Sequence, residues 1–194
     1  IGTSVEEDVA FGPENKNIEP EKIRKIVETV LRKVKLWDRR KASPSILSGG
    51  QKQRLATADA LAGLPACLVL DEPTAMLDPD SRKEVINIVK ELNRKEGMTI
   101  ILITHHTDEV VDADRIVLMK DGKIIGDDIP KKIFADYELL KKAKMDIPPV
   151  VELGMRLEKQ QIGLEGPVLQ EQEMIEKIVK LYRSKCGGKK DAAR

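Results

Sequence analysis

The sequence predicts an α/β fold in which a parallel sheet is covered by helices on both faces. Two apolar runs, Ala66–Leu70 and Met98–Ile103, each have the length of a buried strand. The segment between them, from Pro79 onward, carries apolar residues at helical spacing. Strands that are apolar throughout, rather than in alternation, and that are joined by a helix are typical of a parallel sheet buried on both faces.

Three helices are expected in the first half of the chain. Apolar residues at helical spacing predict a helix from Pro20 to about Leu36. A second helix is expected to start at the glycine pair Gly49 and Gly50 and to end at Gly63. Asp78, followed by a proline, predicts the start of the helix between the strands, with the aspartate as its cap. Residues 1–17 show no sustained period and are expected to form a loop.

The second half is expected to hold a hairpin and several short helices. Asp121 and Gly122 form a strong two-residue turn signal between strand-like runs at residues 115–119 and 123–126. The core is expected to close near Phe134. Helical segments are expected at residues 136–144, 150–157 and 169–182, and the last residues, 187–194, are expected to be disordered.

Composition excludes several classes of protein. The aromatic share of 3% and the net charge of +1 argue against a nucleic-acid partner, which would favour stacking platforms and a basic surface. No apolar stretch approaches the roughly 20 residues of a membrane span, and the N-terminus has no secretory pattern. Cys67 lies in an apolar run and Cys186 in a polar tail, which favours a reducing compartment over a disulfide framework.

A Ser-Gly-Gly turn is the first candidate site. Ser48, Gly49, Gly50 and Gln51 open the second predicted helix, where glycines permit close backbone approach and the helix N-terminus presents N–H groups to an anion. The Ser48 hydroxyl would add a further donor. For a bare Ser-Gly-Gly, a serine cap followed by a flexible turn is the commoner structure.

Two acids and a histidine form the second candidate site. Asp71 and Glu72 follow the first strand, at the sheet edge where open parallel sheets bind ligands. One carboxylate there can hold Mg²⁺ while its neighbour orients or deprotonates a water. His105 follows the second strand, so we expect it in the same crevice. Taken alone, the acids would be a cap or turn and the histidine a surface residue.

These motifs together resemble one family. The segments LSGGQKQR (residues 47–54), LVLDEPTAMLDP (68–79) and ITH (103–105) are similar to those of ATP-binding-cassette proteins. The resemblance implies a partial P-loop NTPase-like parallel sheet. A helical signature subdomain would span residues 1–65, the C-terminal half of the ATPase core 66–134, and a helical extension 135–194.

The resemblance also implies roles for the site residues. ATP would lie between two subunits, with Asp71 acting on Mg²⁺ and Glu72 on the attacking water. His105 would act on the terminal phosphate. The turn at residues 48–51 would bind the nucleotide of the opposite subunit, and Asp78 would communicate across the interface.

Two further segments narrow the resemblance to one subfamily. Residues 1–15 and 136–153 look like the corresponding segments of the ATPases of energy-coupling-factor importers, which take up cobalt, nickel or vitamins. This implies a peripheral protein at the cytoplasmic face of the cell membrane, paired with a second ATPase subunit in a homodimer or heterodimer. It also implies an integral membrane subunit as partner, near the first segment and the helix that begins at Pro20.

Departures from the family leave alternatives open. The 194 residues contain no glycine-rich loop ending in Gly-Lys-Ser or Gly-Lys-Thr, so we expect an N-terminally truncated chain that is inactive alone. It could instead complete the ATP site of a full-length partner, or be a non-functional fragment. A soluble cassette ATPase of DNA repair or translation would need long insertions, which are not visible. Thr57 and Asp59 also depart from the residues usual in the signature helix.

Overall fold

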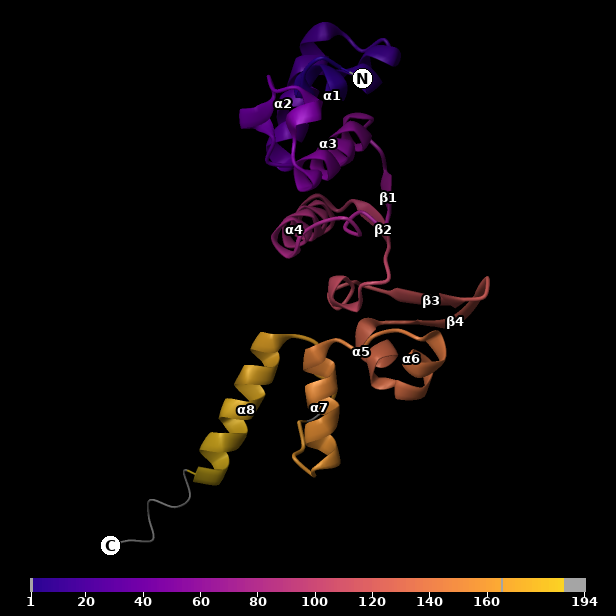
Figure 1. Cartoon of the computed structure of the whole chain (residues 1–194), viewed down its shortest axis with the longest axis vertical. Helices are drawn as coiled ribbons and strands as arrows, with labels where there is room; N and C mark the ends of the chain where they lie inside the picture. Colours follow the sequence, from indigo (N-terminus) through magenta and orange to yellow (C-terminus); the bar gives the residue numbers. More distant parts are fainter. Residues whose placement is uncertain (1, 165, 187–194) are drawn as a thin grey trace, which may run out of the picture. The chain divides into compact units, whose positions relative to one another are not determined.

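The chain forms two compact units, each with an apolar core of its own. Figure 1 labels the helices and strands of both units. The structure is a computed structural model and describes residues 2–164 and 166–186. The first unit ends at Thr104 and the second begins at His105. The division into residues 1–65, 66–134 and 135–194 stays a prediction, and the expected disorder of residues 187–194 falls outside the described residues.

The first unit combines a helical cluster with a two-stranded parallel sheet. Its elements are α1 (Val5–Asn15), α2 (Pro20–Lys33), η1 (Trp37–Arg39), η2 (Pro44–Ile46), α3 (Gly49–Ala62), β1 (Cys67–Asp71), α4 (Pro79–Glu96) and β2 (Thr99–Ile103). The predicted starts of α2, α3 and α4 are confirmed, and α2 ends three residues before the expected boundary. The α/β class with a parallel strand pair is confirmed as well.

The prediction of a loop at the N-terminus is wrong, because residues 5–15 form helix α1. Ser4 caps the helix by accepting a hydrogen bond from the Glu7 backbone N–H, and three acidic residues in the first turn favour its positive end. Val5, Val9 and Pro13 are buried at intervals of four residues, and α1 packs against α2 and α3. With only these few apolar residues and an internal proline, the helical period was too weak to detect.

The expectation that both faces of the sheet are covered is also wrong. The strands pair in parallel from Cys67–Thr99 to Asp71–Ile103, and Leu68 and Leu70 pack into one core with residues of α4. On the opposite face Val69 is 56% exposed, Ile101 50% and Ile103 49%. A single crossover helix covers only one face of the two strands that it connects. Within the described part of the first unit, the second face is therefore open to solvent.

The second unit is built around an antiparallel hairpin and four helices. Its elements are η3 (Thr107–Glu109), β3 (Ile116–Lys120), β4 (Lys123–Asp128), α5 (Pro130–Ala135), α6 (Tyr137–Ala143), α7 (Pro149–Lys159) and α8 (Glu171–Cys186). The predicted hairpin is confirmed, since Asp121 and Gly122 both have positive φ angles, of 50° and 73°. The expected helical segments are confirmed as α6, α7 and α8, and the core includes Phe134 and Leu140.

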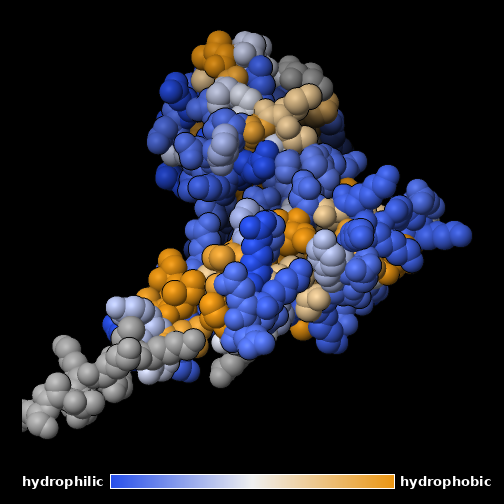
Figure 2. All heavy atoms as spheres, turned by 60° about the horizontal axis from the view of Figure 1, so that its bottom comes forward, coloured by the Kyte–Doolittle hydropathy of each residue, from blue (hydrophilic) through white to orange (hydrophobic). Residues whose placement is uncertain are grey.

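Helix α8 carries apolar residues on two faces. Met174 is buried in a small cluster with Leu164 and Val168. The other face is exposed and consists of Ile175, Ile178, Val179 and Tyr182, of which Tyr182 is 68% exposed. Figure 2 shows a group of hydrophobic residues, in orange, at the lower left of the view. Among the helices at residues 2–164 and 166–186, none is long and apolar enough to cross a membrane.

Asp59 is a partly buried acid where α3 packs against α1. Its Oδ1 is buried with no hydrogen-bond partner in the part of the chain that the structure describes. Burial, and then the negative charge of Asp8, raises the pKa of Asp59 to about 6. Thr57, the other departure noted in this helix, is buried and donates its hydroxyl to the Gln53 carbonyl at 3.0 Å.

Replacing Asp59 by asparagine is expected to raise the melting temperature at pH 8 but not at pH 4. Between the ordinary aspartate pKa of 3.8 and about 6, the folded state holds a proton that the unfolded state has lost, so the free energy of unfolding falls as pH rises through this window. Asparagine has no proton to lose, so the variant does not lose stability in this window. Thermal unfolding of the unmutated chain and of Asp59→Asn at the two pH values measures the difference in melting temperature, with the exposed Asp38→Asn as control. Equal shifts at both pH values would contradict the assignment.

Candidate functional site

The turn at Ser48 is organised as a capping box at the N-terminus of α3. The Ser48 hydroxyl accepts a hydrogen bond from the Gln51 backbone N–H at 3.3 Å, and the Ser48 backbone N–H donates to Gln51 Oε1 at 3.0 Å. The hydroxyl keeps its own hydrogen for a further acceptor. Ser48 and Gly49 are exposed and Gly50 is buried.

This turn can serve both as a cap and as an anion site. The first backbone N–H groups of a helix lack partners within the helix, and its macrodipole places positive potential at the same end. In α3, a 14-residue helix, the first of these groups belong to Gly49, which is exposed, and to Gly50, which is buried. The cap and the anion site expected from the sequence are therefore compatible, since Gln51 uses only the acceptor side of the Ser48 hydroxyl.

Asp71 and Glu72 lie together at the carboxyl end of β1. Asp71 is the last residue of the strand and Glu72 follows it, and both are exposed. The Glu72 backbone N–H donates to the Ile103 carbonyl at 2.9 Å, which continues the pairing with β2 by one residue.

Glu72 adopts a left-handed backbone conformation with φ of 47°. For a residue other than glycine this costs about 1–2 kcal/mol. Such conformations persist where the surrounding structure fixes them, and they cluster at functional sites. The backbone bond to Ile103 is one restraint that fixes Glu72 in place.

The donor set at this strand end suits Mg²⁺ with few protein ligands. Asp71 and Glu72 supply carboxylate oxygens, the ligand type that Mg²⁺ prefers. No group of three or more metal-ligating side chains occurs in the described ranges 2–164 and 166–186. A site with one or two carboxylates fits Mg²⁺, which usually takes its other ligands from water and phosphate.

Asp78 is the N-cap of α4. Its Oδ1 accepts hydrogen bonds from the backbone N–H groups of Asp80 at 3.2 Å and Ser81 at 3.0 Å. Hydrogen bonds from the Ser81 hydroxyl and backbone lower the pKa of Asp78. In the preceding loop the Met76 side chain is 96% exposed, which leaves an apolar group available beside the cap.

His105 belongs to the second unit, so its expected position beside Asp71 and Glu72 stays a prediction. Its ring lies next to that of His106, with centroids 4.1 Å apart and a tilt of 38°. The first unit contains the other predicted site residues, which lie at Ser48–Gln51, Asp71–Glu72 and Asp78.

Comparison with known proteins shows which proteins the chain resembles. The family model for "ABC transporter" matches residues 2–75. The chain is 53% identical over 178 residues to the energy-coupling factor transporter ATP-binding protein EcfA1 of Caldanaerobacter subterraneus. Over most of its length the chain is therefore similar to ABC transporter ATP-binding proteins. The match covers 92% of the chain and 64% of the relative, so the chain spans less than two thirds of that relative's length.

Solved structures of the ABC transporter family have a similar fold. The structure of cbiO1 from Clostridium perfringens, described as part of the ABC transporter complex cbiONQ, matches with a TM-score of 0.67 and 35% identity. The match covers 81% of this chain and 62% of cbiO1. A dimeric ATP-binding cassette in a post-hydrolysis state, bound to ADP and Pi, matches with a TM-score of 0.51 and 32% identity over 58% of this chain and 49% of that one.

Proposed function

We propose that this chain is part of the ATP-binding and ATP-hydrolysing subunit of an energy-coupling-factor importer. The observation that carries the proposal is the exposed pair Asp71 and Glu72 at the carboxyl end of a parallel strand, with Glu72 held in a left-handed conformation. The identity to EcfA1 and the fold shared with a cassette bound to ADP and Pi support it. The hydrolysis of ATP would be coupled to transport.

The proposed reaction is attack of water on the terminal phosphorus of ATP. The new P–O bond forms as the bond to the β–γ bridging oxygen breaks, giving ADP and phosphate. Glu72 would orient the water and accept its proton, and His105 would hydrogen-bond a terminal phosphate oxygen. Asp71 would hold Mg²⁺, which would neutralise negative charge on the phosphates during the reaction.

The remaining site residues would act across a subunit interface. The Ser48 hydroxyl and the backbone N–H groups of Gly49 and Gly50, positioned by Gln51, would contact the terminal phosphate of ATP held on the opposite subunit. Asp78, with the exposed Met76 beside it, would lie at the same interface. The dimeric cassette among the similar structures supports a second ATPase subunit as partner.

We further propose an integral membrane subunit as partner and a peripheral location at the cytoplasmic face of the membrane. The name of the EcfA1 relative and the description of cbiO1 as part of a transporter complex support this assembly. Helices α1 and α2 would lie near the membrane subunit. No nucleic-acid partner is proposed, in keeping with the low aromatic content and a net charge near zero.

A chimeric subunit tests the proposal. In it, this chain replaces the segment of the Caldanaerobacter relative with which it aligns, and the subunit is assembled with that relative's own transporter partners. We expect ATP hydrolysis that is lost when Mg²⁺ is chelated, measured as phosphate release. The unmodified relative is the control. A folded, assembled chimera with no hydrolysis, beside an active control, would contradict the proposal.

A further inference from the structure

Gly50 lies in close contact with helix α4. A Cβ built on Gly50 would lie 2.6 Å from Ser81 Oγ and 2.7 Å from Ser81 Cβ, separations that packed atoms do not adopt. At Gly49, one residue earlier, the nearest atom to such a Cβ is Leu77 Cδ2 at 3.7 Å, an ordinary contact. Of the two glycines in the turn, Gly50 is therefore the one that the packing requires.

Ser81 is held from two sides. Its backbone N–H donates to Asp78 Oδ1 at 3.0 Å, and its hydroxyl also hydrogen-bonds that carboxylate. Its side chain then fills the space where a side chain at Gly50 would be. The cap of α4 and the first turn of α3 thus meet at a single serine.

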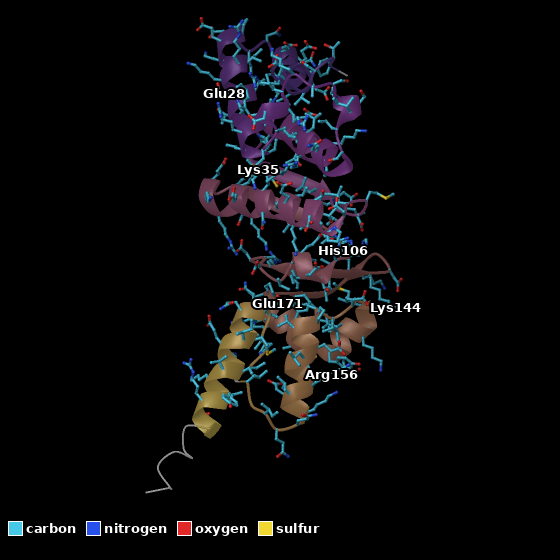
Figure 3. All side chains as sticks on the ribbon, turned by 60° about the vertical axis from the view of Figure 1, so that its left-hand side comes forward. Glu28, Lys35, His106, Lys144, Arg156 and Glu171 are labelled. Atoms are coloured by element: carbon cyan, nitrogen blue, oxygen red, sulfur yellow. The ribbon has the colours of Figure 1, made fainter. Side chains whose placement is uncertain are left out.

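A second contact joins the same two helices about one turn further along. Arg54 Nη1 lies 3.2 Å from Glu84 Oε2, and this ion pair joins an Arg54 side chain that is 11% exposed to a Glu84 side chain that is 40% exposed. Lys35, labelled in Figure 3, places its Nζ 4.0 Å from Glu84 Oε1. Two points of contact, at Gly50–Ser81 and Arg54–Glu84, fix both the separation and the direction of the helix pair.

We propose that Ser81 and Arg54 are positioning residues that join the Ser48 turn and the Asp78 cap into one rigid piece. When the opposite subunit contacts either the Ser48 turn or the Asp78 cap, the turn and the cap then move together. This inference rests on the proposed function, because it assigns the coupling between two parts of the same interface. Each acts through the helix that it fixes.

A double-mutant cycle on the full chain tests the contact itself. Alanine is a better helix former than glycine, so Gly50→Ala would raise the melting temperature if space allowed it. We expect it to lower the melting temperature instead, and to have a much smaller effect when Ser81 is replaced by glycine. Gly49→Ala, the matched control for stability, is expected to lack the penalty. An equal penalty for Gly50→Ala in both backgrounds would overturn the proposal.

Exchange of the ion pair is an independent test that does not depend on Gly50. Arg54→Glu places two acids together and is expected to lower the melting temperature, whereas Arg54→Glu combined with Glu84→Arg is expected to restore it. If the exchange restores nothing, the pair does not join the helices and the proposal fails.

The chimeric subunit tests the consequence for turnover. We expect Gly50→Ala and Arg54→Glu each to lower kcat at least about tenfold while the KM for ATP changes less than about threefold. Ser81→Gly and Glu84→Arg, respectively, are expected to rescue kcat. Loss of kcat without rescue would overturn the positioning role. An unmutated chimera without ATPase activity would refute the proposed function instead, and the melting experiments on the chain would still decide the contact.

Discussion

Replacing Glu72 by glutamine in the chimeric subunit is expected to abolish ATP turnover while ATP binding stays close to the unmutated value. Glutamine keeps the shape of the side chain but cannot accept the proton of the attacking water. Loss of a general base typically costs about 10²–10⁴ in rate. Phosphate release measures turnover, and equilibrium binding of labelled ATP measures affinity.

The chain offers a matched control for this substitution. Asp121 is also an exposed acid with a positive φ, of 50°, but it lies in the turn between β3 and β4. Asp121→Asn makes the same change from carboxylate to amide in the same backbone region and is expected to leave turnover unchanged. Undiminished hydrolysis in Glu72→Gln would refute the assignment of the base.

Replacing Phe134 by alanine is expected to remove a large share of the stability of the second unit. Phe134 is 1% exposed and packs in a core with Ile133 and Leu140. Truncating a buried phenylalanine costs about 3–5 kcal/mol. At roughly 0.05–0.15 kcal/mol per residue, a unit of about 90 residues has only about 4–13 kcal/mol of stability in total. Urea unfolding, followed by circular dichroism, measures the loss of stability, and limited proteolysis shows whether cleavage within the second unit increases.

Phe11 provides the comparison, because the chain has only these two phenylalanines. Phe11 lies on α1 and is 50% exposed, so little apolar contact is lost when it is truncated. Phe11→Ala is expected to leave the urea midpoint of the second unit unchanged. Equal losses from both substitutions would show that the core around Phe134 contributes no more than the surface does.

Local signals predicted most of the secondary structure. The capped starts at Ser48 and Asp78 and the Asp-Gly turn at Asp121 are short-range features, and the structure has each where it was expected. Helix α1 escaped detection because its burial depends on contacts with α2 and α3. The open face of the sheet was not predicted for a related reason. An apolar residue such as Val69 indicates that a position favours burial, but it does not indicate which element covers that position.

The candidate site was predicted in its residues but not in its geometry. Asp71 and Glu72 were expected at the strand end, yet no pattern indicated the left-handed conformation of Glu72, which is rare for glutamate. Ser81 and Arg54 were missed as well. Their contacts join residues about 30 positions apart, and such contacts leave no periodic or short-range signal in a single sequence.

The uncovered side of the β1–β2 pair affects how the polypeptide behaves before assembly. The exposed apolar surface of this two-stranded sheet is formed by Val69, Ile101 and Ile103. The edges of the strands therefore lie next to exposed aliphatic side chains. This combination invites strand addition by other chains, the route by which aggregates grow. At high concentration the described chain is therefore expected to self-associate through this face of the sheet.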